Sequence, residues 1–285
     1  METKKENKVK TVMEAVAITL LYLLIQLAVS IIISLVVSLT MSVDNMDKEA
    51  LLDSINAMQP LMLFISNLIC TVLFGIWYYL GYVRKDKLAG TYEPWHEKMC
   101  DAKVIAFIVF SSLAIGLFDR HIADLIIMIS PESGELLSTI MSNVSEVTPM
   151  NITSMVILSA MATAFAFPGI IMQKFKNSFG MAACIIIPAI LFAVLMLNPV
   201  QIIYGIPFGL VMMFISYKFN SVVPGMLVIL INNIGAILLN QIFSPGLPPV
   251  VSACCVVIFL ALSIFMYRKI PFSNKDTKDI PSQNE

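Results

Sequence analysis

Long apolar runs separated by short polar segments make up most of this chain. A helix needs about 20 apolar residues to cross the hydrocarbon of a bilayer, and eight runs approach or exceed that length. We therefore predict an all-α fold, a polytopic bundle of about eight transmembrane helices. The predicted helices are Val12–Met41, Pro60–Val83, Val104–Ile129, Ile152–Met172, Met181–Leu197, Val200–Tyr217, Val222–Phe243 and Val250–Tyr267.

The composition agrees with a membrane protein. Hydrophobic residues occupy 58% of the 285 positions and charged residues 13%, whereas a soluble domain carries about 25% charged residues. The first run is too long for a cleaved signal peptide and lacks a small-residue cleavage site, so we expect it to remain as a helix. The predicted organisation is a cytoplasmic basic tail (1–11), a single membrane domain (12–267) and a disordered cytoplasmic tail (268–285).

The positive charges alternate along the chain. Sixteen of the 18 Lys and Arg residues lie in the two tails and in the second, fourth and sixth connections, and the other connections are acidic. Because cytoplasmic loops carry an excess of Lys and Arg, this alternation predicts that both termini are cytoplasmic. The expected location is the cell membrane of a bacterium, where the protein contacts the lipid bilayer and no nucleic acid.

The third run contains ionisable residues that are unusual for a membrane span: Asp119, Arg120, His121 and Asp124. A helix that enters near Lys103 reaches Asp119 after about 24 Å at 1.5 Å per residue, which is still within the hydrocarbon. A charge there requires a partner or a water-filled cavity. Arg120 and Asp124 are four residues apart and are expected to pair if the helix continues. The alternative is that the helix breaks near Phe118 and the charges lie among the outer headgroups.

Three later runs contain polar or helix-breaking residues that lipid contact does not require. The first has Phe167-Pro168-Gly169, followed by a basic exit. The second has Phe192 four residues before Met196, followed by Leu197-Asn198-Pro199. The third has Val223-Pro224-Gly225 before Ile229 and Asn233. This arrangement, within residues 152–243, resembles the core of the CPBP family of intramembrane CAAX-type and bacteriocin-processing metalloproteases.

The resemblance implies a zinc peptidase site whose ligands and base are replaced in this chain. The family places two Glu and an Arg on the first of these helices, a His on the second, and a His and an Asn on the third. The corresponding residues here are Thr163, Ala164, Pro168, Met196, Ile229 and Asn233. Only the Asn matches. It is expected either to keep its family role near a substrate carbonyl or to form a hydrogen bond between helices.

Hydrolysis of a peptide at zinc needs His or carboxylate ligands, an open coordination position and a carboxylate base. No Asp, Glu or His occurs between Asn151 and Arg268, so this segment cannot supply them. We therefore predict no catalytic residues and no cofactor. The expected protein is a pseudoenzyme that binds hydrophobic, lipidated or bacteriocin-like peptides, or other membrane proteins.

Two other functions remain open at this stage. An active endopeptidase would need zinc ligands from outside the usual motifs, such as Asp119, His121 and Asp124. A small transporter would use the same polar residues to line its path, although broken helices in paired halves, which mark many transporters, are not evident.

Overall fold

A computed structural model describes residues 7–40, 48–94, 99–130, 148–242 and 248–270. All regular secondary structure in these ranges is helical, which confirms the all-α prediction. The ends of both predicted tails (1–6 and 271–285) and the connection 131–147 lie outside the described residues.

Seven helices are long and apolar enough to cross a membrane. The one remaining predicted span, the fifth along the chain, corresponds to α11 (Met181–Leu195). This helix has only 15 residues and rises about 22 Å, less than the roughly 30 Å of hydrocarbon. Six of the seven long helices are formed wholly or mainly by one segment each: α1 (Lys8–Thr40), α3 (Gln59–Tyr78), α6 (Ala102–Ile129), α12 (Pro199–Lys218), α13 (Val222–Ile242) and α14 (Pro249–Lys269). The helix α3 continues through a π-helical turn, η1 (Tyr79–Val83), into α4 (Arg84–Ala89).

The remaining long helix, Pro149–Lys176, is the centre of the bundle. It consists of α8 (Pro149–Ile152), η2 (Thr153–Leu158), α9 (Ser159–Ala164), η3 (Phe165–Ile171) and α10 (Met172–Lys176), where η2 and η3 are π-helical. Two thirds of its apolar window (67%) is buried, against 11% for α14. Its segments pack against α1, α3, α11, α12 and α13. We call it the central helix.

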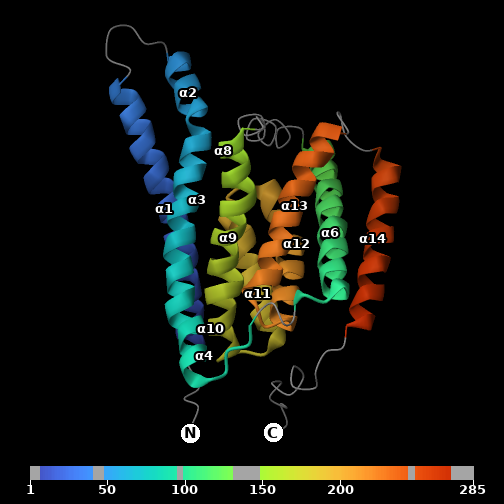
Figure 1. Cartoon of the computed structure of the whole chain (residues 1–285). Coiled ribbons are helices and arrows are strands. Elements are labelled where there is room, and N and C mark those ends of the chain that lie inside the picture. Colours follow the sequence, from blue (N-terminus) through green and yellow to red (C-terminus); the bar gives the residue numbers. More distant parts are fainter. Residues whose placement is uncertain (1–6, 41–47, 95–98, 131–147, 243–247, 271–285) are drawn as a thin grey trace.

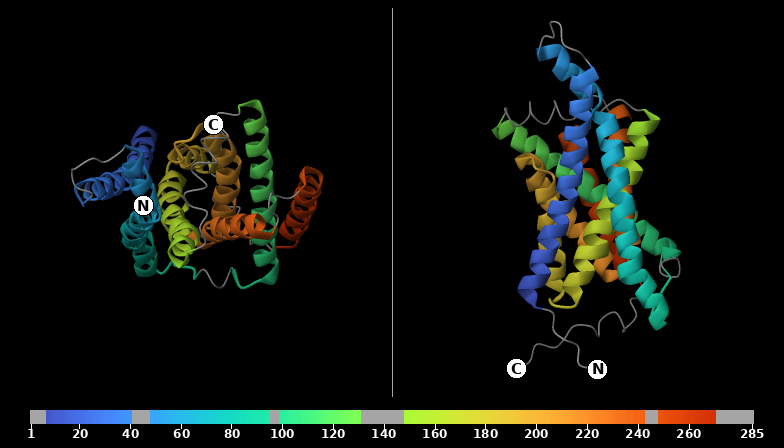
Figure 2. Two further views of the ribbon diagram at one scale, coloured as in Figure 1. Left: turned by 90° about the horizontal axis from the view of Figure 1, so that it is seen from above. Right: turned by 90° about the vertical axis from the view of Figure 1, so that its left-hand side faces the viewer.

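The other helices form layers on the two sides of the central helix (Figures 1 and 2). On one side lie α1 and α3; on the other lie α11, α12 and α13, then α6, and finally α14 at the far edge, where it packs against α6. The start of α1 and the end of α14 lie at the same end of the molecule (Figure 1).

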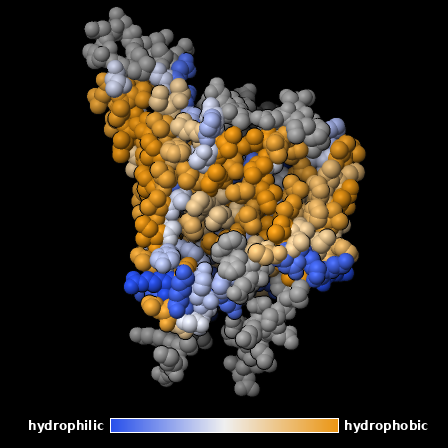
Figure 3. All heavy atoms as spheres, viewed as in Figure 1, coloured by the Kyte–Doolittle hydropathy of each residue, from blue (hydrophilic) through white to orange (hydrophobic). Residues whose placement is uncertain are grey.

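Basic side chains gather at that same end, below a broad apolar belt (Figure 3). They come from the start of α1 and from α4, α10 and the ends of α12 and α14: Lys8, Lys10, Arg84, Lys85, Lys87, Lys174, Lys176, Lys218, Arg268 and Lys269. A multi-pass membrane protein has this distribution of apolar and basic surface. We call this the basic end.

Two features of the outer half were left open by the sequence pattern. The third span does not break at Phe118, because α6 runs without interruption to Ile129. The segment after the first span contains a helix, α2 (Lys48–Ala57), in place of a plain loop. This helix continues upward from α3 and does not lie flat across the bundle (Figure 1).

Candidate functional site

The motif residues of the first core helix lie inside the bundle. Thr163 and Ala164 on α9 are 7% and 0% exposed, and Pro168 in η3 is also buried. The hydroxyl of Tyr22 on α1 reaches the Thr163 side chain. Tyr22 itself is 2% exposed and stacks on Phe74 of α3, with ring centroids 5.6 Å apart. Thus α1 supplies an aromatic side chain that fills the space beside Thr163.

Pro168 is accommodated by a change in backbone hydrogen bonding. Proline has no N–H to donate to the carbonyl four residues earlier and normally kinks or breaks a helix. In η3 the backbone N–H groups donate to the carbonyl five residues back. The Ala164 carbonyl therefore accepts from the N–H of Gly169 and needs none from Pro168. Gly169 also lets neighbouring helices come close: an added Cβ would lie 3.0 Å from Val222 and 3.1 Å from Tyr78.

The second π-helical segment, η2, creates a specific demand for a hydrogen-bond donor. At its end the backbone N–H of Ser159 donates to the Ser154 carbonyl, five residues back, and the Met155 carbonyl accepts from the Ser159 hydroxyl in place of this N–H. The side-chain amide of Asn233 on α13 donates to that carbonyl at 2.7 Å and to the Ser159 hydroxyl at 3.3 Å. The one family residue that this chain keeps therefore forms a hydrogen bond between α13 and the central helix.

The opposite side of the central helix makes similar contacts with α3. The Asn67 amide donates to the carbonyl and hydroxyl of Ser154 at 3.3 and 3.4 Å, and the Thr71 hydroxyl donates to the Leu158 carbonyl at 3.0 Å. The sequence pattern did not point to these residues. The one indication was Asn67 itself, because a side-chain amide within an apolar run costs free energy in the membrane unless it has a hydrogen-bond partner.

The other two motif positions lie on α11 and α13. Ile229 is 6% exposed on α13, which packs against α9, the helix of Thr163. Met196 follows α11 and is half-buried, with its sulfur 3.0 Å from the position of a Cβ on Gly205 of α12. That the side chains of Thr163, Met196 and Ile229 face one common interior point stays a prediction.

The connection from α11 to α12 is the short turn that Asn198-Pro199 predicted. Asn198 is the N-cap of α12, and its side-chain oxygen accepts from the backbone N–H groups of Val200 at 2.9 Å and Gln201 at 3.4 Å. Pro199 occupies the first helical position, where a missing N–H costs nothing. This turn fixes where α11 ends and therefore how far along the bundle axis Met196 lies.

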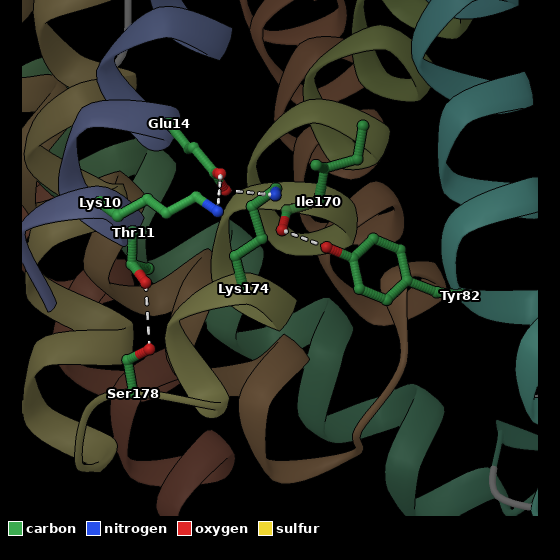
Figure 4. A network of polar contacts seen from close by, with 7 residues as sticks. All are labelled: Lys10, Thr11, Glu14, Tyr82, Ile170, Lys174 and Ser178. Carbon is green, nitrogen blue, oxygen red and sulfur yellow. Dashed lines mark hydrogen bonds and ion pairs between the residues drawn. The ribbon is translucent and has the colours of Figure 1, made fainter. Parts of the chain in front are cut away.

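At the basic end, polar contacts fasten α1 to the central helix (Figure 4). Glu14 forms an ion pair with Lys174 of α10 at 2.5 Å and a looser one with Lys10 at 3.9 Å. The hydroxyls of Thr11 and Ser178 are 3.0 Å apart. From the other side, the Tyr82 hydroxyl donates to the Ile170 carbonyl at 3.3 Å. The Glu14 and Thr11 contacts thus tie the start of α1 to the end of the central helix and the turn after it.

The polar group on α6 is not assembled into one site. Asp119 is 8% exposed, whereas Asp124 is exposed on the surface of α6. Although the helix continues past Phe118, Arg120 and Asp124 form no ion pair within the described residues, contrary to our expectation. A surface pair contributes only about 0–1 kcal/mol, too little to hold two long side chains together. Because Asp119 and Asp124 face differently, they do not converge with His121 on one metal position.

Zinc does not fit the residues at the motif positions. Thr163 offers a neutral hydroxyl, Ala164 and Ile229 offer only hydrocarbon, and the thioether of Met196 is a soft ligand that does not suit a hydrolytic zinc. Across the described residues, no three His, Cys, Asp or Glu side chains are grouped so that they could hold a metal ion. We therefore derive no catalytic step from zinc.

In the described residues, seven helices are long and apolar enough to cross a membrane, and one of them is the buried, π-bulged central helix; this architecture defines a multi-pass membrane protein. Residues 145–235 match the family model of the type II CAAX prenyl endopeptidase Rce1-like proteins. This segment includes the central helix, α11, α12 and most of α13, and the match confirms the resemblance to the CPBP family. No curated protein and no solved structure matches the chain.

Proposed function

We propose that the protein is a non-catalytic member of this family that binds hydrophobic or lipidated peptides, or other membrane proteins, without cutting them. The observation that carries the proposal is the position of Thr163 and Asn233, the two motif positions that hold polar side chains. Thr163 meets Tyr22, and Asn233 binds the Met155 carbonyl. Asn233 is engaged between two helices and Thr163 is buried beside Tyr22, so we expect neither to polarise a substrate peptide bond.

The surface of α3 supports binding of a lipidated ligand. A shallow, open groove on the exposed face of this helix is lined by aliphatic side chains of α3 alone: Leu68, Ile69, Val72, Leu73 and Ile76. Burying an acyl or prenyl chain contributes about 0.8 kcal/mol per CH₂ group. A prenyl chain attached to a peptide would compete for this groove with the acyl chains of the bilayer.

The proposal also includes a location in a bacterial cell membrane with both termini in the cytoplasm. The gathering of basic residues at the end where α1 starts and α14 ends supports this orientation.

Photo-cross-linking with a farnesylated peptide that ends in a CAAX sequence tests the binding proposal. In detergent micelles we expect saturable cross-linking, an intact peptide, and little reaction with the same peptide lacking farnesyl. Val72→Trp, which fills the groove, should weaken cross-linking, whereas Leu125→Trp on the exposed surface of α6 should not. A shortened peptide, or equal cross-linking with and without farnesyl, would contradict the proposal.

A further inference from the structure

One face of the long helix that contains α3 changes from apolar to basic along its length. The segments α3, η1 and α4 form one continuous helix, Gln59–Ala89. Residues three or four apart share a helix face. Five exposed residues of this helix follow one another at such steps: Val72, Ile76, Leu80, Arg84 and Lys87. The first two line the shallow groove on α3, and the last two lie on α4, at the basic end (Figure 1). We call this row the α3–α4 face.

Two tyrosine rings hold the Lys87 side chain at this face. Its Nζ atom lies 5.9 Å from the ring centroid of Tyr79 and 5.0 Å from that of Tyr92. Tyr92 reaches Lys87 because the chain turns back after α4: Gly90 has a φ of 69°, and the Thr91 N–H donates to a carbonyl of α4 at 3.0 Å. A side chain that is already ordered loses less conformational entropy when it binds a ligand. Lys87 is therefore positioned in advance to contact an anion.

Within the described residues, Arg84 and Lys87 form no ion pair. The two ion pairs between described residues both involve Glu14, which lies on α1. Asp86 is the acidic residue of α4, but it is two positions from Arg84 and one from Lys87, and residues so spaced do not share a helix face. The positive charges of the α3–α4 face are thus available to an anion from outside the chain.

The spacing along this face defines the chemistry of its ligand. Arg84 and Lys87 lie about 12 and 16 Å along the helix axis from Ile76. A ligand that meets all three therefore carries an anionic group next to a long apolar part, which a free phosphate lacks. In a zwitterionic lipid a positive group cancels the charge of the phosphate, whereas anionic lipids attract Lys and Arg at the membrane surface.

We propose that the α3–α4 face binds an anionic phospholipid from the leaflet at the basic end. Its acyl chains lie along Val72 and Ile76, and its phosphate contacts Arg84 and Lys87. Arginine suits this role because its guanidinium group binds phosphate oxygens in a bidentate manner. This inference does not rest on the proposed function; a lipidated peptide would have to displace the phospholipid from the groove.

The end of α14 provides a comparison with the same charge. Arg268 and Lys269 also follow an exposed apolar surface at the basic end. They are consecutive residues, which point about 100° apart on a helix, and the Lys269 Nζ atom lies 4.2 Å from the ring centroid of Phe265. Because these two charges do not share one helix face, we expect them to confer no such lipid preference.

Quenching of Trp77 fluorescence by brominated lipids tests the site. The chain has two tryptophans, and Trp95→Phe leaves Trp77, which is exposed and follows Ile76 on α3. This parent protein is reconstituted into phosphatidylcholine vesicles that contain an equal fraction of brominated phosphatidylglycerol or brominated phosphatidylcholine. We expect phosphatidylglycerol to compete for the face about fivefold better or more, the effect of at least one basic residue at the surface of an anionic membrane.

Two double variants assign the preference. Arg84→Gln with Lys87→Gln should make the two lipids bind about equally, because it removes both charges of the face. Arg268→Gln with Lys269→Gln removes the same charge at the same end and should keep the preference. Equal quenching by the two lipids in the parent protein, or an equal loss of preference in both double variants, would overturn the proposal. The second result would mean that the basic end attracts anionic lipid as a whole.

Discussion

At the scale of single residues, one backbone carbonyl explains why Asn233 is present. The π-helical turn η2 takes the Ser159 N–H away from the Met155 carbonyl, which accepts instead from the Ser159 hydroxyl and from Asn233 at 2.7 Å. In the hydrocarbon no water is available to donate to it. Asn233 is thus used here to add a donor from α13 to the backbone of a neighbouring helix.

Replacing Asn233→Leu should therefore lower stability. The substitution keeps the side-chain volume similar and leaves the Met155 carbonyl without its amide donor. We expect a loss of about 0.6–1.7 kcal/mol, the range for hydrogen bonds between membrane helices, measured by denaturant unfolding in detergent. Ile234→Ala, at an exposed position of the same helix, is the control. Unchanged stability of Asn233→Leu would show that this bond contributes nothing.

Residue identity alone indicated part of the site. The resemblance to the CPBP motifs singled out Thr163, Met196, Ile229 and Asn233. Asn67, Thr71 and Tyr22 could not be found in this way, because their role depends on which helix lies beside them. Conversely, the spacing of Arg120 and Asp124 predicted a pair that does not form, since the pair has little energy at an exposed position.

At the scale of elements, the central helix depends on close approach at Gly169. A Cβ there would lie 3.0 Å from Val222, 3.1 Å from Tyr78 and 3.2 Å from the Ala164 carbonyl. Because such overlap forces neighbours apart, Gly169→Ala should destabilise the protein by about 1–3 kcal/mol. Gly235→Ala, inside α13, is the matched control, since its Cβ position meets only Leu113, at 3.9 Å. Thermal melting of the two variants checks this, and equal melting temperatures would refute the packing argument.

The attachment of α1 to α10 is a second property of elements. Glu14 and Lys174 are 2.5 Å apart with side chains 36% and 23% exposed, so the pair contributes only a modest amount. Lys174→Glu places two like charges together and should lower the melting temperature. Adding Glu14→Lys to that variant restores opposite charges and should recover most of the loss. Failure of the double variant to recover would mean that the two residues act independently.

The apolar pattern gave the helices but not their internal hydrogen bonding. A run that is apolar on all sides contains no information on whether N–H groups pair four or five residues back, so η2 and η3 were not predicted. Pro168 indicated an irregularity, and the structure resolves it as a π-helical segment without a break. The run at Met181 was predicted to reach Leu197, but α11 stops at Leu195 because Asn198 begins the next helix.

At the scale of the whole molecule, the basic end predicts the orientation in the membrane. We expect it to face the cytoplasm. In a variant without native cysteines, Leu88→Cys on α4 should be labelled by a membrane-impermeant thiol reagent only in inverted vesicles. Leu52→Cys on α2, at the opposite end (Figure 1), should be labelled in intact cells. The reverse labelling pattern would show that the basic end faces away from the cytoplasm.

The central claim is that a peptidase scaffold here holds no hydrolytic site, and zinc content measures this most directly. Elemental analysis of the purified protein should find no stoichiometric zinc, and a chelator should leave its melting temperature unchanged. A variant that carries Thr163→Glu, Ala164→Glu, Pro168→Arg, Met196→His and Ile229→His should gain zinc if the family alignment is correct. Stoichiometric zinc in the unmodified protein, or a melting temperature that falls when a chelator is added, would contradict the account.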